Sequence, residues 1–151
     1  MGKLMFEKYG FGSLLFEYQS LLTLMAEGKE TGTVLDSGDG VSHVIPVYKG
    51  NIMKHAIKRL NLAGRHVTEY LIKQLLIRGY AFNSSADFEV VREIKEDLCY
   101  VSIDTTKERK IARDTTIINT EYKLPDGQTI IVGRERFEAP EILMNPNLFD
   151  S

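Results

Sequence analysis

The segment Asp36-Ser37-Gly38-Asp39-Gly40 is the part of the sequence whose residue types point most directly to chemistry. Glycines let the backbone approach a ligand closely and adopt positive φ angles, and successive backbone N–H groups in a turn form a concave anion site. Asp36 would repel a phosphate unless a divalent cation lay between them, and Mg²⁺ favours carboxylate, water and phosphate oxygens. The segment therefore predicts a phosphate and cation site. The alternative is an ordinary hairpin turn, in which Asp and Gly are common.

Two other side chains have the chemistry to place a water molecule near a terminal phosphate. His43 follows the turn on the next predicted strand, where it could orient such a water. Gln19 lies among leucines on a predicted helix, and a buried glutamine would need hydrogen-bond partners there. The alternatives are a structural histidine and a glutamine at the helix edge. The spacing of His43, His55, His66 and Cys99 does not fit a zinc site.

A third group of polar residues falls on a predicted helix further along the chain. Arg92, Lys95 and Glu96 stand at positions i, i+3 and i+4, so they share one helix face. Such a face could bind the base and ribose of a nucleotide. It could also be an ordinary charged face exposed to solvent.

The elements that must position these groups alternate between strands and helices. Apolar residues recur at helical spacing in three runs, glycines follow the first two runs as stops, and Ser84 with Asp87 forms a possible capping box before the third. This order predicts an α/β layered fold. The predicted elements are a strand at 4–7, a helix at 13–28, a hairpin of strands at 33–35 and 41–48, a strand or irregular connection at 52–60, helices at 64–79 and 84–98, a second hairpin around 122–128 and a short helix at 141–143.

Length and composition limit the classes of protein. The 151 residues suffice for one ordinary domain with a core. The net charge of −2 gives no reason to expect nucleic acid or an anionic membrane as the main partner. No apolar run approaches the ~20 residues that span a bilayer. Cys99 is the only cysteine, so no intrachain disulfide can form, which fits a reducing compartment such as the cytoplasm.

Several long segments, in order, resemble the actin family over about residues 5–149. They are TGTVLDSGDGVSHVIPVY around the turn, AIKRLNLAGR, DLCYV and LPDGQTIIVGRERFEAPE. The run YLIKQLLIRGYAFNSSADFEVVREIKEDLCYV is similar to an actin-related member of the family and less so to conventional actin. The resemblance implies an actin-like, RNase H-like ATPase fold of the α/β class. It implies the hinge helix and a preceding strand at 1–28, the phosphate-binding hairpin of the third subdomain at 29–62 and the fourth subdomain at 63–151.

The resemblance also implies a ligand and a role for each candidate residue. ATP and Mg²⁺ (or Ca²⁺) are the implied ligands, and Asp36 would reach the cation through water. The other implied contacts are the phosphates for Gly38, Asp39 and Gly40, the attacking water for Gln19 and His43, the nucleoside for Gly64, and the adenine and ribose for Arg92, Lys95 and Glu96. His66 and Asn61 depart from the pattern, because the family has acidic residues at both positions.

The function implied is that of a slow ATPase that acts as a conformational switch. Its host would be a cytoskeletal complex that starts new actin filaments as branches, with actin and the other subunits as partners. The alternatives are a conventional filament-forming actin, a metabolic relative such as a sugar kinase or chaperone ATPase, and an inactive fragment. The first phosphate hairpin of the family, its lysine and the Gly-Gly nucleotide loop have no counterpart here. We therefore expect no ATPase activity from the 151-residue chain by itself.

Overall fold

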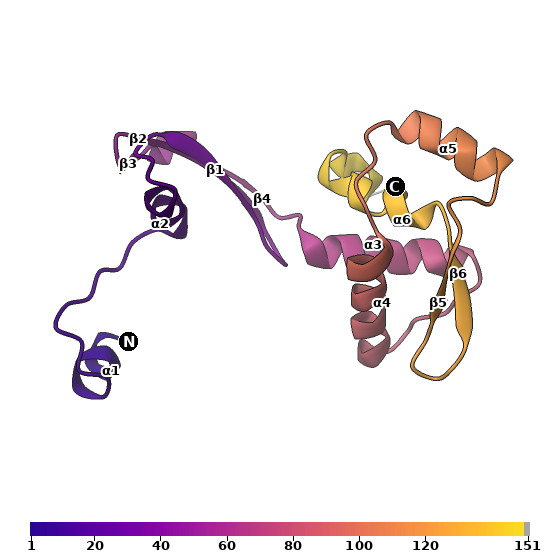
Figure 1. Ribbon diagram of the computed structural model, residues 1–151, viewed down its shortest axis with the longest axis horizontal. Helices are drawn as coiled ribbons and strands as arrows, with labels where there is room; N and C mark the ends of the chain where they lie inside the picture. Colours follow the sequence, from indigo (N-terminus) through magenta and orange to yellow (C-terminus); the bar gives the residue numbers. More distant parts are fainter. Residues whose placement is uncertain (150–151) are drawn as a thin grey trace. The chain divides into compact units, whose positions relative to one another are not determined.

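The computed structural model describes residues 1–149, which form two compact units (Figure 1). The first unit contains residues 1–36 and 43–59, and the second contains residues 37–42 and the chain from Leu60 onward. The tip of the first hairpin, at 37–42, therefore belongs to the second unit by its contacts. Within the described residues, no helix has the length and apolar character needed to cross a bilayer.

The first unit is a small sheet with one helix packed on it. Strand β2 is flanked by β1 and β3, and β4 also pairs with β2. Leu21 and Leu24 of the helix are 6% and 7% exposed and pack with Val47, which is 2% exposed. The elements are α1 (Gly2–Glu7), α2 (Gln19–Ala26), β1 (Gly32–Ser37), β2 (Ser42–Tyr48), β3 (Asn51–Ile52), the 3₁₀ helix η1 (Lys54–Ala56) and β4 (Lys58–Leu60).

The predicted strand at residues 4–7 is wrong, because these residues belong to helix α1. Leu4 and Phe6 remain 49% and 48% exposed, so no core fixes this segment. A strand without a neighbour leaves its backbone N–H and C=O groups unpaired, whereas a helix satisfies them internally. The helical form follows from that difference.

The helix predicted from Ser13 begins only at Gln19. The residues before it have no regular structure, and Leu15 and Phe16 are 73% and 65% exposed. A short helix in water depends on packing of its apolar face. Here that packing starts at Leu21. The apolar side chains between residues 14 and 18 have no core of this unit to pack against.

The hairpin predicted around the turn is confirmed. Strands β1 and β2 are neighbours in the sheet, and a connection of four residues between them permits only an antiparallel pair. The amide of Gly38 donates to the carbonyl oxygen of Val41 at 3.1 Å and closes the turn. Residues 51–60 combine two short strands with a 3₁₀ turn, where either a strand or an irregular connection was expected.

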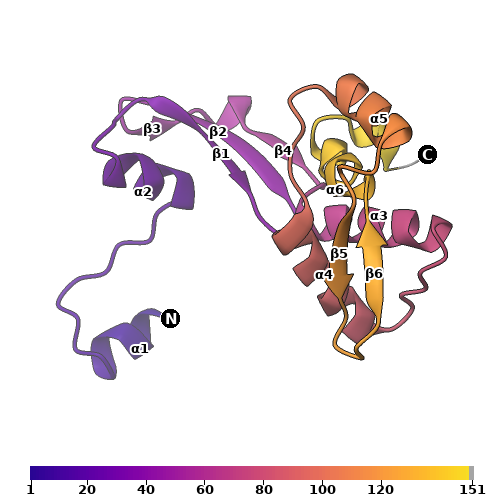
Figure 2. The ribbon, with the colours of Figure 1, turned by 45° about the vertical axis from the view of Figure 1, so that its right-hand side comes forward.

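The second unit packs two longer helices against a hairpin and a C-terminal set of short helices (Figures 1 and 2). Strands β5 and β6 pair antiparallel from Thr120↔Val132 to Lys123↔Thr129, which confirms the second predicted hairpin. The elements are α3 (Gly64–Ile77), α4 (Ser85–Leu98), α5 (Thr105–Asp114), β5 (Thr120–Lys123), β6 (Thr129–Val132), α6 (Glu135–Glu138), η2 (Pro140–Leu143) and η3 (Pro146–Leu148).

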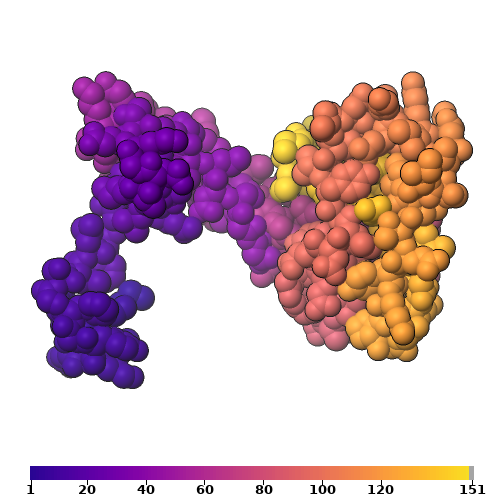
Figure 3. Space-filling model, in the orientation of Figure 1, coloured from indigo at the N-terminus to yellow at the C-terminus, as the bar shows by residue number. Residues whose placement is uncertain are grey.

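The core of this unit lies where α3, α4 and the hairpin meet. Its central side chains are no more than 1% exposed: Leu71, Leu75, Val91, Ile94 and Ile130. The space-filling view shows the pink, orange and yellow residues of this unit packed closely together (Figure 3). Most of the apolar stripe that predicted α3 and α4 is therefore buried, but Leu76, expected on the same face of α3, is 54% exposed.

The ends of the two helices match their sequence signals. The Ser84 hydroxyl accepts from the Asp87 amide at 3.1 Å, and the Asp87 carboxylate accepts from the Ser84 amide at 2.8 Å. This confirms the capping box at the start of α4. These hydrogen bonds, first those with Ser84, hold the pKa of Asp87 below its usual value. Gly79 has φ of +96° just after α3, where glycine is the residue that ends a helix.

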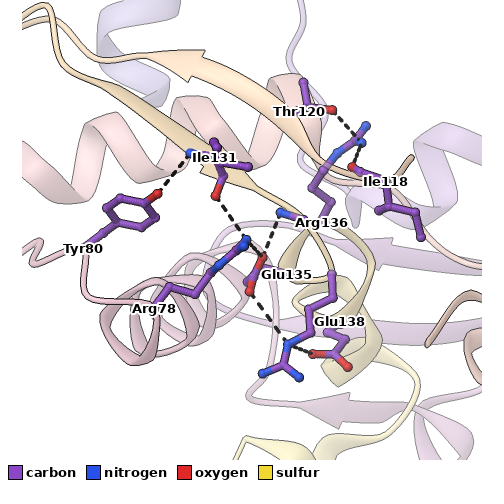
Figure 4. A network of polar contacts seen from close by, with 10 residues as sticks. Arg78, Tyr80, Ile118, Thr120, Ile131, Glu135, Arg136 and Glu138 are labelled. Atoms are coloured by element: carbon purple, nitrogen blue, oxygen red, sulfur yellow. Dashed lines mark hydrogen bonds and ion pairs between the residues drawn. The ribbon is translucent and has the colours of Figure 1, made fainter. Parts of the chain in front are cut away.

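A buried ion pair ties α3 to the C-terminal end of the hairpin (Figure 4). Arg78 Nη1 donates to Glu135 Oε2 at 3.0 Å and to the Ile131 carbonyl at 3.1 Å. The same carboxylate oxygen accepts from the Gly133 amide at 2.9 Å. The Glu135 side chain is only 2% exposed, so its carboxylate depends on these donors, whereas the Arg78 side chain, 33% exposed, also reaches water.

A second arginine joins α4 to the segment before the hairpin (Figure 4). Arg136 Nε donates to the Leu98 carbonyl at 2.9 Å. Its Nη1 donates to the Ile118 carbonyl at 2.7 Å and to Thr120 Oγ1 at 2.8 Å. Three polar acceptors inside the unit are thereby satisfied by one side chain, as buried polar groups require.

Candidate functional site

The predicted phosphate turn is held by the first turn of helix α3. The Gly64 amide donates to the Gly38 carbonyl at 3.0 Å, and the Arg65 amide donates to the Asp39 carbonyl at 2.8 Å. The first amides of a helix have no acceptor within the helix. The turn supplies the acceptors for two of these amides. Carbonyls of the turn point to α3 as a result.

Gly64 lies in close contact with the turn. A Cβ atom there would lie 3.4 Å from the Gly38 carbonyl oxygen, 3.6 Å from Lys95 Nζ and 3.9 Å from the Asp39 Cα. The first of these distances lies at the short limit of ordinary van der Waals contact, so a side chain here would fill the space between the helix and the turn. The structure thus brings Gly64 and Lys95 together with the turn, as predicted for a shared site.

Gly38 and Gly40 differ from the expectation in their backbone angles. Neither has a positive φ, so the predicted conformational reason for glycine in the turn is wrong. A Cβ on Gly40 would meet nothing within 4 Å, and one on Gly38 only the Val41 carbonyl oxygen at 4.0 Å. No steric contact inside the chain demands glycine here, and side chains would project into the open space in front of the turn.

The amides of the turn are suited to an anion. Among residues 1–149, no acceptor of the chain receives a hydrogen bond from the amides of Asp39 or Gly40. Open space beside two glycines and two unused backbone donors are what a phosphate group needs. The residues present therefore fit the phosphate part of the predicted ligand.

The remaining three predicted residues lie in the first unit. Asp36 is half-buried on β1, on the same face as Val34 two residues earlier, and it forms no ion pair within the described chain. His43 is half-buried on β2. Gln19 is exposed at the first position of α2, which agrees with the alternative of a glutamine at the helix edge. The described residues show no direct contact among the three.

The predicted face on α4 divides into two parts. Arg92 binds two carboxylates of its own helix, Glu89 at 2.8 Å and Glu96 at 2.9 Å. Hydrogen bonds from Glu89 and then from Glu96 raise the pKa of Arg92 above its usual value. Lys95 instead donates to the Gly64 carbonyl at 3.4 Å. Only Lys95 of the three thus has a direct contact with the α3 end of the site.

A groove in the second unit begins beside the turn. Its volume is about 910 Å³, and Asp39 and Arg65 border it at one end. Phe82 and Phe88 line it further along, and Arg92 belongs to its wall. Of the predicted site residues, Asp39 and Arg92 therefore face one concave surface. Nowhere in residues 1–149 do three His, Cys, Asp or Glu side chains gather as a metal site.

Two contacts beside the candidate site were not predicted from the sequence. Arg65 Nη2 forms an ion pair with Asp39 Oδ2 at 2.8 Å, with both side chains 59% exposed. His66 Nδ1 accepts from the Ala63 amide at 3.1 Å. The signal for both was their position, because residues next to Gly64 at the start of a helix must lie close to whatever that glycine touches.

Comparisons with known proteins complete the description of the site. Residues 1–151 match the sequence model of the family described as Actin. Over 150 residues the chain is 55% identical to actin-related protein 2 of Acanthamoeba castellanii and 55% identical to that of Saccharomyces cerevisiae. The identity to actin-related protein 2 of Drosophila melanogaster is 54%. Each match covers 99% of this chain but only 38–39% of the relative, so the chain spans about two-fifths of their length.

Proposed function

Because the chain belongs to the actin family, we propose that it forms one wall of an ATP-binding cleft in a subunit of the actin-related protein 2/3 complex. That complex nucleates branched actin filaments, and ATP would set the conformation of the subunit within it. The observation that carries the proposal is the turn at 37–42, whose free amides and open glycines are held in place by the start of α3. The 55% identity to relatives named actin-related protein 2 supports the choice of subunit.

The chemistry proposed for the turn is the binding of phosphate oxygens. The amides of Asp39 and Gly40 would donate to them, and Gly38 leaves room for their approach. A bound divalent cation would neutralise part of the phosphate charge. Asp36 would hold a water molecule of that cation, which explains an acidic side chain at the entrance to a phosphate site.

The roles of the other residues follow from their hydrogen-bonding groups. Gln19 and His43 would position a water for attack on the terminal phosphate, a role of orientation that suits slow hydrolysis. Gly64 would lie against the nucleoside. Arg92, Lys95 and Glu96 would bracket the adenine and ribose.

The division of the chain into parts of the actin fold is also a proposal. We assign residues 1–28 to the hinge helix and the segment that precedes it, 29–62 to the phosphate-binding hairpin of the third subdomain and 63–151 to the fourth subdomain. Cytoskeletal location in the cytoplasm, with actin and the other subunits of the complex as partners, belongs to the same proposal. Each part rests on the family and on the similarity to actin-related protein 2.

A titration of the 151-residue chain with MgATP, followed by amide NMR, tests the nucleotide site. The largest shifts should fall on the amides of Asp39, Gly40 and Gly64. Gly40→Ala should weaken the binding, because the methyl group would occupy the space in front of the turn. Gly12→Ala is the matched control, since a Cβ there also meets nothing within 4 Å. Shifts that avoid the turn, or equal binding by both variants, would refute the assignment.

A chimera tests the cellular role. The 150 residues of Saccharomyces cerevisiae actin-related protein 2 that match this chain would be replaced by it. We expect the chimera to assemble with the other subunits and to form branches when ATP is present. The control carries the corresponding segment of a conventional actin. If the chimera fails to assemble or to form branches while the control forms them as the unchanged yeast protein does, the choice of subunit is overturned.

A further inference from the structure

Arg65 holds Asp39 of the phosphate turn by two separate contacts. The Arg65 amide donates to the Asp39 carbonyl at 2.8 Å, and its Nη2 atom lies 2.8 Å from Asp39 Oδ2. The first contact fixes the backbone of Asp39, and the second fixes the direction of its carboxylate. Backbone and side chain of one residue thus act on the same position of the turn.

The guanidinium of Arg65 has a second carboxylate within reach. Glu69 stands four residues later on α3, which is the usual spacing for an ion pair along one helix. Within residues 1–149, however, the ion pair that Arg65 forms is the one with Asp39. Its side chain is therefore directed at the turn and not along its own helix.

The carboxylate of Asp39 opposes the binding of an anion at the turn. The amides of Asp39 and Gly40 find no acceptor among the described residues, and such amides form an anion site. The carboxylate belongs to the same residue as one of them and has the same sign of charge as a phosphate. At about 4 Å, two like charges weaken binding about fivefold even at the dielectric constant of water.

The ion pair removes most of this opposition. A guanidinium at 2.8 Å from the carboxylate leaves the two side chains with almost no net charge for an approaching anion. Both side chains are 59% exposed, and exposed ion pairs contribute little to the stability of a fold. The pair therefore matters more for what approaches the turn than for the folding of the second unit.

The other cations near the turn have different partners. Lys95 Nζ donates to the Gly64 carbonyl at 3.4 Å, and Arg92 pairs with two carboxylates of its own helix. Among the ion pairs of residues 1–149, the one that includes Asp39 is formed by Arg65. Neutralisation of Asp39 thus depends on this one side chain.

We propose that Arg65 is a positioning residue of the phosphate site, which neutralises the Asp39 carboxylate and holds it beside α3, so that the amides of the turn stay open to phosphate oxygens. The inference rests on the proposed function, because it concerns how the same turn accepts an anion. It gives the side chain of Arg65 a role that is separate from the backbone bond between Arg65 and Asp39.

The test is binding of tripolyphosphate with Mg²⁺ to the 151-residue chain, followed by the amides of residues 39 and 40 in NMR titrations. This probe has no ribose, so a contact of Asp39 with a sugar cannot affect the result. Arg65→Gln keeps the backbone bond but leaves the carboxylate unneutralised, and it should bind about fivefold more weakly than the parent. Arg65→Lys keeps the charge and should bind nearly as the parent does.

The Asp39→Asn change separates an electrostatic role of Arg65 from a structural one. Alone, it removes the negative charge and should strengthen binding. Combined with Arg65→Gln, it leaves both positions uncharged, so affinity should return to within about twofold of the parent. If the Arg65 side chain only held the turn in shape, the double variant would stay as weak as Arg65→Gln, and that result would overturn the proposal.

Arg113→Gln is the matched control, because it removes the same charge from an exposed ion pair with Asp114 on α5. It should bind as the parent does, and a loss as large as that of Arg65→Gln would contradict a specific role for Arg65. Full binding by Arg65→Gln would refute the role of Arg65 and leave the phosphate site intact. No shift of the turn amides in the parent or any variant would refute the phosphate site itself, and the role of Arg65 with it.

Discussion

The buried Glu135 gives a stability prediction that does not depend on function. In Glu135→Ala, the Gly133 amide and the Arg78 guanidinium lose the carboxylate oxygen that both now share at 2.9 and 3.0 Å. One buried donor left without an acceptor costs about 1–3 kcal/mol, and breaking a buried ion pair costs about 3–5 kcal/mol in all. Arg78 keeps its bond to the Ile131 carbonyl and is 33% exposed, so we expect a loss near the lower end, about 3 kcal/mol.

The assay is urea unfolding followed by far-ultraviolet circular dichroism, because the two 14-residue helices α3 and α4 of the second unit dominate the helical signal. With a denaturant slope of about 2 kcal/mol per molar, the midpoint should fall by about 1.5 M. Glu135→Gln keeps the shape of the side chain and should fall between parent and alanine variant. If alanine abolishes folding, this second variant still gives a midpoint.

Asp114→Asn is the control, because Asp114 pairs with Arg113 at side-chain exposures of 62% and 76%. Exposed pairs contribute between about 0 and 1 kcal/mol, so its midpoint should stay close to that of the parent. If Glu135→Ala loses no more stability than Asp114→Asn, the network around Arg78 does not hold the second unit together as argued here.

Three further outcomes are expected. Asp36→Ala in the yeast chimera should weaken Mg²⁺-dependent ATP binding and slow hydrolysis by up to about 10²-fold, because its action through water and metal is indirect; unchanged affinity and turnover would exclude this role. The 151-residue chain with MgATP should release no phosphate above background in a coupled assay, since its donors reach phosphate from one side only, and steady turnover would contradict that account. Burial raises the pKa of Cys99 to about 12, so at pH 8 its thiolate fraction is on the order of 10⁻⁴; a thiol reagent should react slowly with the folded chain and rapidly in urea.

The elements predicted correctly are those whose signals are local. The capping box of Ser84 and Asp87 and the glycine after α3 each act within a few residues, so the sequence contains all that is needed to place these helix ends. The same holds for the hairpin turn closed by Gly38 and Val41. The start of helix α2 is not set by a local signal, because it depends on where Leu21 and Leu24 meet the sheet.

Helix α5 was not predicted, although its signal is local. It has no buried residue, so no apolar stripe revealed it. Asp104 nevertheless caps it, accepting from the Lys107 amide at 3.0 Å. An acidic residue followed by two threonines and a run of good helix formers was the available signal, and a search for apolar spacing alone overlooks it.

The glycines of the candidate site are of two kinds. Gly64 lies against the turn, where a Cβ would reach the Gly38 carbonyl oxygen at 3.4 Å, the short limit of ordinary van der Waals contact. Gly40 has open space where its Cβ would be and an ordinary φ angle. The close approach of the turn favours glycine at position 64, whereas no contact within the described residues requires glycine at position 40. The open space at Gly40, beside amides that find no acceptor among the described residues, supports the phosphate site proposed above.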